Sequence, residues 1–204
     1  MTDNNPYEVG RLLRAGTSAC VVGCRVSQAN APVFGALVRI PFPNEDYQIY
    51  GLVYNIAIDD DGLVRQLVTA EGISDDVLAD NRVNRNVPVE FSVLHIGYRE
   101  AGRIRHALPP RPPLSLDAIY RCDAGELAAF TGVGRFGYFR HILRAESDIP
   151  VGDLLAAHLR QAHPAHLAAG NPHWRDRAAQ ELITLLRDDY GRLMDVMAAI
   201  GEEF

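Results

Sequence analysis

Hydrophobic and polar positions alternate along the first half of the chain, as they do in half-buried β-strands. Such runs, rich in β-branched residues, cover 19–26, 34–40, 48–58, 63–69 and 88–96, and a weaker run covers 103–108. Glycine, proline or acidic turn residues lie between them. Six short strands separated by turns are typical of a closed barrel, because closure leaves no strand edge exposed. We therefore expect a six-stranded closed β-barrel over residues 16–108, preceded by an N-terminal arm over 1–15.

The period of the pattern changes after a proline-rich segment at 109–113, which we interpret as a stiff linker. Asp123 and Glu126 form a capping box ahead of a helix over 127–130. Further helices are expected over 136–144 and 151–162, and one long helix from Asn171-Pro172 to Ile200. Residues 114–204 are thus expected to be helical. The predicted fold class is α+β, with an N-terminal six-stranded closed barrel followed by a small helical C-terminal region.

The amino-acid composition excludes two classes of enzyme and indicates where the protein is found. All 20 basic residues among the 204 are arginine, so both a P-loop and a Schiff-base enzyme, which need lysine, are excluded. No run approaches the roughly 18 apolar residues of a membrane-spanning helix, and the N-terminus is not typical of a signal peptide. The chain has three cysteines, and Cys20 and Cys24 lie too far apart along one strand for a disulfide. We therefore expect a reduced, cytoplasmic protein.

Arginines are concentrated between residues 82 and 111, although the whole chain carries a net charge of −6. Only Glu90 and Glu100 oppose them in this interval. Clustering along the sequence predicts a basic surface only if the folded chain also brings the side chains together. The candidate contacts for nucleic acid or a protein partner are Arg82, Arg85, Arg99, Arg103, Arg105 and Arg111.

The second half contains two patterns that could carry chemistry. Residues 132–137 read GVGRFG, a literal GxGxxG, but a dinucleotide site needs a preceding strand. We expect instead the loop that ends a helix, with Gly132 as its C-cap. Four histidines lie close together, and zinc would accept such ligands. We expect one of them, His158, to pack in the core and Pro164 to interrupt its helix. The four are His158, His163, His166 and His173.

Three apolar strands carry a resemblance to a known family. Residues 20–26 read CVVGCRV, 35–40 read GALVRI and 50–56 read YGLVYNI. This order resembles the HAS-barrel, the N-terminal barrel of HerA-type DNA-translocating ATPases and of ATP synthase catalytic-type subunits. The family has an acidic residue where this chain has Ala36. The resemblance implies a barrel that is not catalytic, that packs protomers into a ring or that docks a partner such as a nuclease.

The leading hypothesis is a non-catalytic barrel-based assembly protein that docks onto a separate ring ATPase or nuclease, in DNA processing. We expect it to have no catalytic, metal-binding or cofactor-binding residues, and its barrel could form homo-oligomers. Two alternatives remain open. One is a nucleic-acid-binding barrel that uses the arginines of 82–111. The other is a metal-dependent hydrolase that uses the histidines of 158–173.

Overall fold

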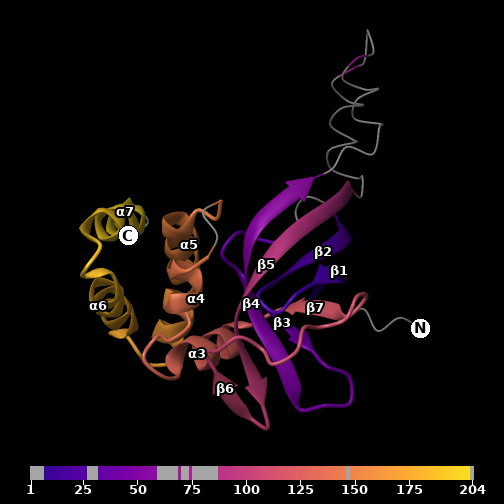
Figure 1. Ribbon diagram of the computed structural model, residues 1–204, viewed down its shortest axis with the longest axis horizontal. Coiled ribbons are helices and arrows are strands. Elements are labelled where there is room, and N and C mark those ends of the chain that lie inside the picture. Colours follow the sequence, from indigo (N-terminus) through magenta and orange to yellow (C-terminus); the bar gives the residue numbers. More distant parts are fainter. Residues whose placement is uncertain are drawn as a thin grey trace.

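The computed structural model describes residues 7–26, 32–58, 69, 74, 87–145 and 148–202. Six strands close an antiparallel barrel in the order β2-β1-β7-β3-β4-β5, because β2 also pairs with β5 (Figure 1). A short strand, β6, continues β5 outside this ring. The expected closed six-stranded barrel is confirmed. The strands are β1 (Glu8–Ala15), β2 (Ala19–Val26), β3 (Leu37–Pro41), β4 (Tyr47–Ile58), β5 (Val87–Glu100), β6 (Arg103–Arg105) and β7 (Ala118–Arg121).

Two of the six barrel strands are not the expected ones. β1 comes from the expected N-terminal arm, and β7 follows the proline-rich segment and pairs with both β1 and β3. The predicted strand over 103–108 is shorter, and β6 does not close the ring. The predicted strand over 63–69 and the loop over 71–86 lie outside the described residues, except for Thr69 and Ser74. The barrel therefore draws on residues on both sides of the expected 16–108 span.

The two faces of the barrel strands contribute side chains to two different hydrophobic cores. One fills the barrel interior and includes Val53 and Val93. The other lies between the outside of the barrel and the helices and includes Leu52 and Leu94, the residues next to them in sequence. Alternate side chains of β4 and β5 thus enter opposite cores. Because both faces of β4 are covered, every residue from Tyr47 to Val53 is buried.

The helices lie together on one side of the barrel, and α3 lies beside the strands (Figure 1). Asp123 accepts a hydrogen bond from the Glu126 amide at 2.8 Å, as the predicted capping box requires, whereas the Glu126 carboxylate pairs with Arg39. None of the described helices is both long and apolar enough to cross a lipid bilayer. The helices are α3 (Ala124–Gly132), α4 (Phe139–Leu143), α5 (Val151–Ala168), α6 (Trp174–Leu186) and α7 (Tyr190–Glu202).

Two predictions about the helices are wrong. α5 continues through Pro164 to Ala168, because its residues before and after the proline, including Leu159 and Ala165, are buried and hold the helix in place. The long helix to Ile200 is divided into α6 and α7. Asp189 ends the first by donating its amide to the Leu186 carbonyl, and its carboxylate accepts from the Arg192 amide at the start of the second.

Candidate partner-binding surface

Three exposed leucines lie on two adjoining segments, β1 and the turn before β7, and we refer to Leu13, Leu114 and Leu116 as the leucine patch. Their exposed fractions are 49%, 70% and 72%. Leu13 lies at an irregularity in the pairing of β1 with β2, where the register shifts between Leu12 and Arg14. Its side chain covers Gly23 of β2, because a Cβ there would come within 3.1 Å of Leu13 Cδ2.

The other two members of the leucine patch lie in the turn that leads into β7. The Leu116 amide donates to the Leu12 carbonyl at 2.8 Å, so the turn is fixed against β1. The Asp117 carboxylate accepts from the Leu114 amide at 2.8 Å. Leu116 has a φ of +72°, a left-handed conformation that costs an L-residue roughly 1–2 kcal/mol. The turn therefore holds an apolar side chain in solvent at a cost in backbone strain.

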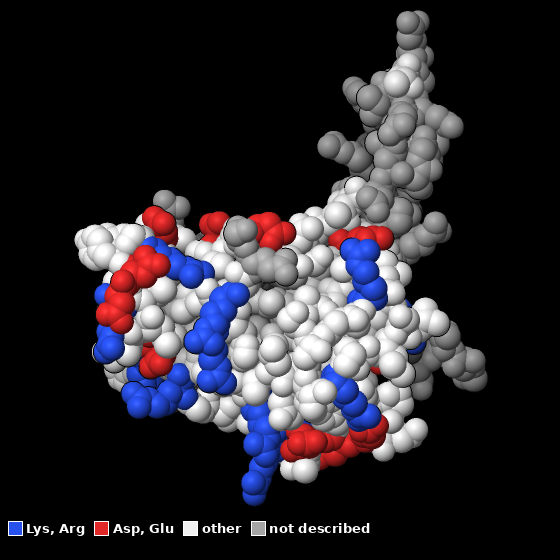
Figure 2. All heavy atoms as spheres, viewed as in Figure 1, with Lys and Arg blue, Asp and Glu red and all other residues white. Residues whose placement is uncertain are grey.

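The candidate arginines of the basic segment do not share one environment. Arg82 and Arg85 lie outside the described residues. Arg99 forms an ion pair with Asp46 at 3.4 Å, and Arg111 forms one with Glu45. The last two candidates, Arg103 and Arg105, are exposed on β6, where Arg103 lies opposite Glu100. Acidic side chains from the β3–β4 turn thus accompany part of the basic segment, and basic and acidic groups alternate over the face in Figure 2.

Arg111 is held by aromatic rings as well as by its carboxylate. Its guanidinium lies 4.7 Å from the centre of the Phe42 ring and 5.3 Å from that of Tyr47. Such cation–π contacts and the ion pair with Glu45 fix the proline-rich segment against the β3–β4 turn. The Arg111 side chain is half exposed, but these contacts give it a structural role.

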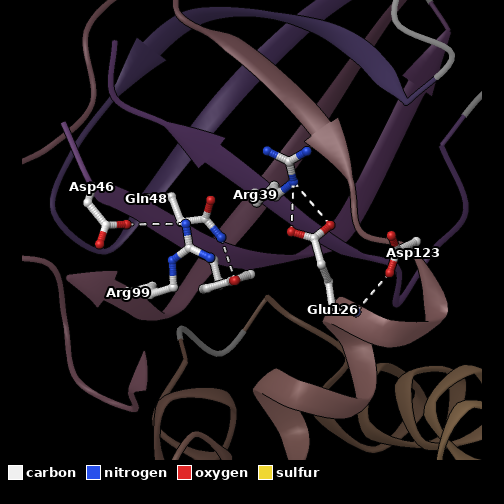
Figure 3. Close-up of polar contacts among 7 residues, drawn as sticks. Arg39, Asp46, Gln48, Arg99, Asp123 and Glu126 are labelled. Carbon is white, nitrogen blue, oxygen red and sulfur yellow. Dashed lines mark hydrogen bonds and ion pairs between the residues drawn. The ribbon is translucent and has the colours of Figure 1, made fainter. Parts of the chain in front are cut away.

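A partly buried ion pair connects the barrel to its helices. Arg39 of β3 points toward Glu126 of α3 in Figure 3, and the Arg39 Nε lies 3.0 Å from a Glu126 carboxylate oxygen. The same guanidinium lies 5.0 Å from the centre of the Tyr120 ring on β7. Arg39 thus joins two barrel strands to the first helix, at a position next to the Asp123 cap.

Three of the four late histidines make different contacts. His158 is fully buried between Gly35 of the barrel and Tyr138, as expected for a core residue. His166 is buried on a different part of α5, whereas His173 is exposed and lies 3.6 Å from Asp176. Within the described ranges, no group of three or more His, Cys, Asp or Glu side chains is placed to hold a metal ion.

His166 belongs to a polar cluster beneath α6. Its Nε2 lies 2.7 Å from the Thr131 Oγ1, and its ring stacks on Trp174 at 4.2 Å between centres. The Trp174 indole donates to the Thr131 carbonyl at 3.2 Å. Burial lowers the His166 pKa to about 4, so the imidazole is neutral near pH 7. These contacts join α3, α5 and α6, so His166 has a structural role.

The GxGxxG segment follows the end of α3, so a helix and not a strand precedes it. This agrees with the expected helix-ending loop. The predicted C-cap is displaced by one residue, because Gly132 is the last residue of the helix and Val133 is its C-cap. The left-handed residues are Gly134 and Phe136, with φ of +62° and +51°. The helix therefore ends with an extended residue, before the turn itself begins.

The leucine patch is not predicted by the sequence pattern. Its one available signal is the pair of leucines in PPLSL, apolar residues that follow prolines and lack a helical or alternating pattern. Their proximity to Leu13 depends on the pairing of β7 with β1, which the sequence did not predict. Comparison of the sequence with models of protein families and with curated proteins gave no match.

Proposed function

We propose that this chain is a non-catalytic assembly protein that uses the outside of its barrel to dock a protein partner, a ring ATPase or a nuclease of DNA processing. The observation that carries the proposal is the leucine patch. Isolated exposed leucines are common on protein surfaces, but here three lie on two segments that the backbone hydrogen bond from Leu116 to Leu12 joins, and Leu116 is left-handed. Strain maintained at an exposed apolar group is typical of a binding surface.

The environment of the potential catalytic groups supports the same proposal. The buried His158 and His166 both make contacts that join elements of the fold. Burial raises the pKa of the Cys122 thiol well above its usual value, which disfavours the nucleophilic thiolate. The resemblance of the three strands to the HAS-barrel is the reason for proposing a ring ATPase or a nuclease as the partner. It also favours a cytoplasmic location and a homo-oligomeric ring as the setting of the docking.

The test is capture of partners from the host's lysate by the tagged chain, at low and high salt, with identification by mass spectrometry. We expect stoichiometric recovery of a P-loop ATPase or nuclease that survives high salt, because the patch is apolar. A Leu114→Asp/Leu116→Asp variant should lose this partner. Leu185→Asp, at a leucine of α6 that is 43% exposed, is the matched control and should retain it.

Two results would overturn the proposal. One is equal capture of the partner by the patch variant and the wild-type chain, which would place the docking surface elsewhere. The other is nucleotide hydrolysis by the pure chain at a rate that scales with its concentration, which would make it an enzyme. Circular dichroism of each variant shows whether the fold is intact before capture is compared.

A nucleic-acid-binding barrel is the second candidate, supported by one observation. Arg103 and Arg105 are both exposed at two alternate positions of β6, so their side chains share a face of the strand. Phosphate contacts by such residues predict binding that weakens steeply as salt rises. Fluorescence anisotropy of labelled DNA at low salt, with an Arg103→Gln/Arg105→Gln variant, tests it. Absence of binding by the wild-type chain at low salt would end this alternative.

A further inference from the structure

A pocket of about 330 Å³ lies between the turn after α3 and one face of α6. The turn contributes residues of the GxGxxG segment, which the proposed docking function does not use. The helix contributes one stripe of side chains that recur every three or four residues, Trp174, Arg177, Glu181 and Thr184, with Gln180 beside it. A volume near 300 Å³ suits a small organic ligand. In Figure 2, basic side chains with acidic ones beside them lie over the α6 region, at the lower left.

The backbone of the turn offers unused hydrogen-bond donors. Within the described residues, the amides of Gly134 and Arg135, the first two residues of the turn 134–136, donate to no acceptor of the protein. The sign of φ alternates across the three residues of this turn, since only Gly134 and Phe136 are left-handed. Such alternation is typical of turns whose successive amides converge on an anion. Phe136 is held in its unusual conformation by its buried ring, which stacks on Phe139 at 5.2 Å.

The charges around the pocket also favour an anion. Arg135 and Arg177 line it from the turn and from α6, against a single acid, Glu181. Arg177 is oriented by Asn171, whose Oδ1 accepts from its guanidinium at 2.7 Å. Within the described residues, Arg135 has no ion-pair partner. Two guanidinium groups beside free amides are the donors that proteins use for phosphate.

The far side of the pocket has a different chemistry. Gln180, Glu181 and Thr184 supply a carboxamide, a carboxylate and a hydroxyl from α6. A carboxylate beside a phosphate site would repel a second anionic group but accept hydrogen bonds from hydroxyls. The indole N–H of Trp174 donates to the Thr131 carbonyl and is therefore not free to bind a ligand. The Trp174 ring thus offers the pocket only an apolar surface.

We propose that this pocket binds a small sugar phosphate. The phosphomonoester would lie against the amides of the turn, Arg135 and Arg177, and the sugar hydroxyls would donate to Glu181 and meet Thr184. The proposal concerns binding only and is independent of the docking function, because the leucine patch lies on β1 and the β7 turn. A ligand at this site would connect α3 to α6 and stabilise the helical layer by mass action.

Trp174 provides the assay, because it is the chain's only tryptophan and lines the pocket. Titration of the full chain with ribose 5-phosphate should change its fluorescence saturably at roughly millimolar concentration or below, with calorimetry as the second measurement. We expect Arg135→Gln and Arg177→Gln each to weaken binding about tenfold or more. Arg103→Gln, on β6 and not among the residues that line the pocket, is the matched control and should bind as the wild type does.

Two further probes separate the parts of the proposal. Ribose should not bind, because the phosphate supplies most of the interaction, and inorganic phosphate should bind more weakly than ribose 5-phosphate. Glu181→Gln should weaken the binding of ribose 5-phosphate but not that of inorganic phosphate. Absence of binding by both fluorescence and calorimetry would overturn the site, as would equal losses in Arg135→Gln and Arg103→Gln. Equal affinity for ribose 5-phosphate and phosphate would overturn the assignment of a sugar.

Discussion

The phenol of Tyr138 lies 3.3 Å from the Nε2 of His158, in a part of the molecule where both side chains are fully buried. The other ring nitrogen of His158 lies 3.3 Å from the carbonyl oxygen of Gly35, in the barrel. With its proton on Nδ1, a neutral imidazole donates to Gly35 and accepts from Tyr138, so each polar group is satisfied. One side chain of α5 thereby joins the barrel to the segment before α4.

This arrangement predicts a pH dependence of stability. Burial lowers the His158 pKa to about 4, and the Gly35 carbonyl opposes this only in part. Between pH about 6.5 and 4 the unfolded chain therefore binds a proton that the folded chain does not. The contribution of His158 to the free energy of unfolding is complete above pH 6.5 and is lost as the pH falls toward 4. Its full size is up to about 3 kcal/mol.

A His158→Gln variant tests this, with urea unfolding at several pH values as the measurement. It should be less stable than the wild type near neutral pH, and the difference should shrink as the pH approaches 4. His173→Gln removes an exposed histidine and is the control, since it should follow the wild-type curve. A difference between His158→Gln and wild type that is constant with pH would contradict the prediction.

Gly35 is expected to tolerate no side chain. Its φ is +79°, and an added Cβ would lie 2.8 Å from the Ala157 Cβ and 2.9 Å from the His158 backbone nitrogen. Gly35→Ala should therefore lower the free energy of unfolding by about 3 kcal/mol or more. Gly102→Ala is the matched control, because Gly102 has a φ of +73° with no atom within 4 Å of the added Cβ. It should cost only about 1 kcal/mol, measured by thermal or urea unfolding.

The strain at Leu116 predicts an inverted order of two variants. Alanine is usually at least as stabilising as glycine, but at a φ of +72° the order should reverse. We expect Leu116→Gly to be about 1 kcal/mol more stable than Leu116→Ala. At the neighbouring Ser115, which is not left-handed, the alanine variant should be the more stable of the pair. The same order at both positions, measured by chemical unfolding, would argue against the strain.

The three cysteines are expected to differ in reactivity. Burial raises the Cys20 pKa to about 12 and also raises that of Cys122, so both thiols remain protonated and covered in the folded state. Cys24 is only half buried and should react first, slowly because burial also raises its pKa. Ellman's reagent should therefore label about one thiol per native chain and three after denaturation. Rapid labelling of all three in the native protein would contradict this.

The parts of the fold that were predicted have regular patterns. β2 matches its predicted bounds, and β4 and β5 differ from theirs by a few residues, because they are long and alternate around buried positions. β1 was not predicted, since irregular pairing at Val9 and Leu13 breaks its alternation. β7 has only four residues, too few to carry a pattern. Short and irregular strands are specified by their neighbours in the sheet, which a sequence does not display.

The candidate site was harder to predict than the fold. Charge clustering along the sequence singled out Arg99 and Arg111, yet acidic partners more than fifty residues away in sequence bind both. The leucine patch depends on a contact between residues about a hundred positions apart, Leu12 and Leu116. Proximity of this kind is set by the topology of the sheet and has no local signature.

The place of β7 between β1 and β3 has a consequence for the order of assembly. A chain emerging from the ribosome cannot close its barrel until residues 118–121 have been made. One edge of β1 therefore stays unpaired while about a hundred residues are synthesised, and one edge of β3 while nearly eighty are. A fragment that ends in the proline-rich segment would keep those edges. The barrel and the beginning of the helical layer are therefore expected to fold as one cooperative unit.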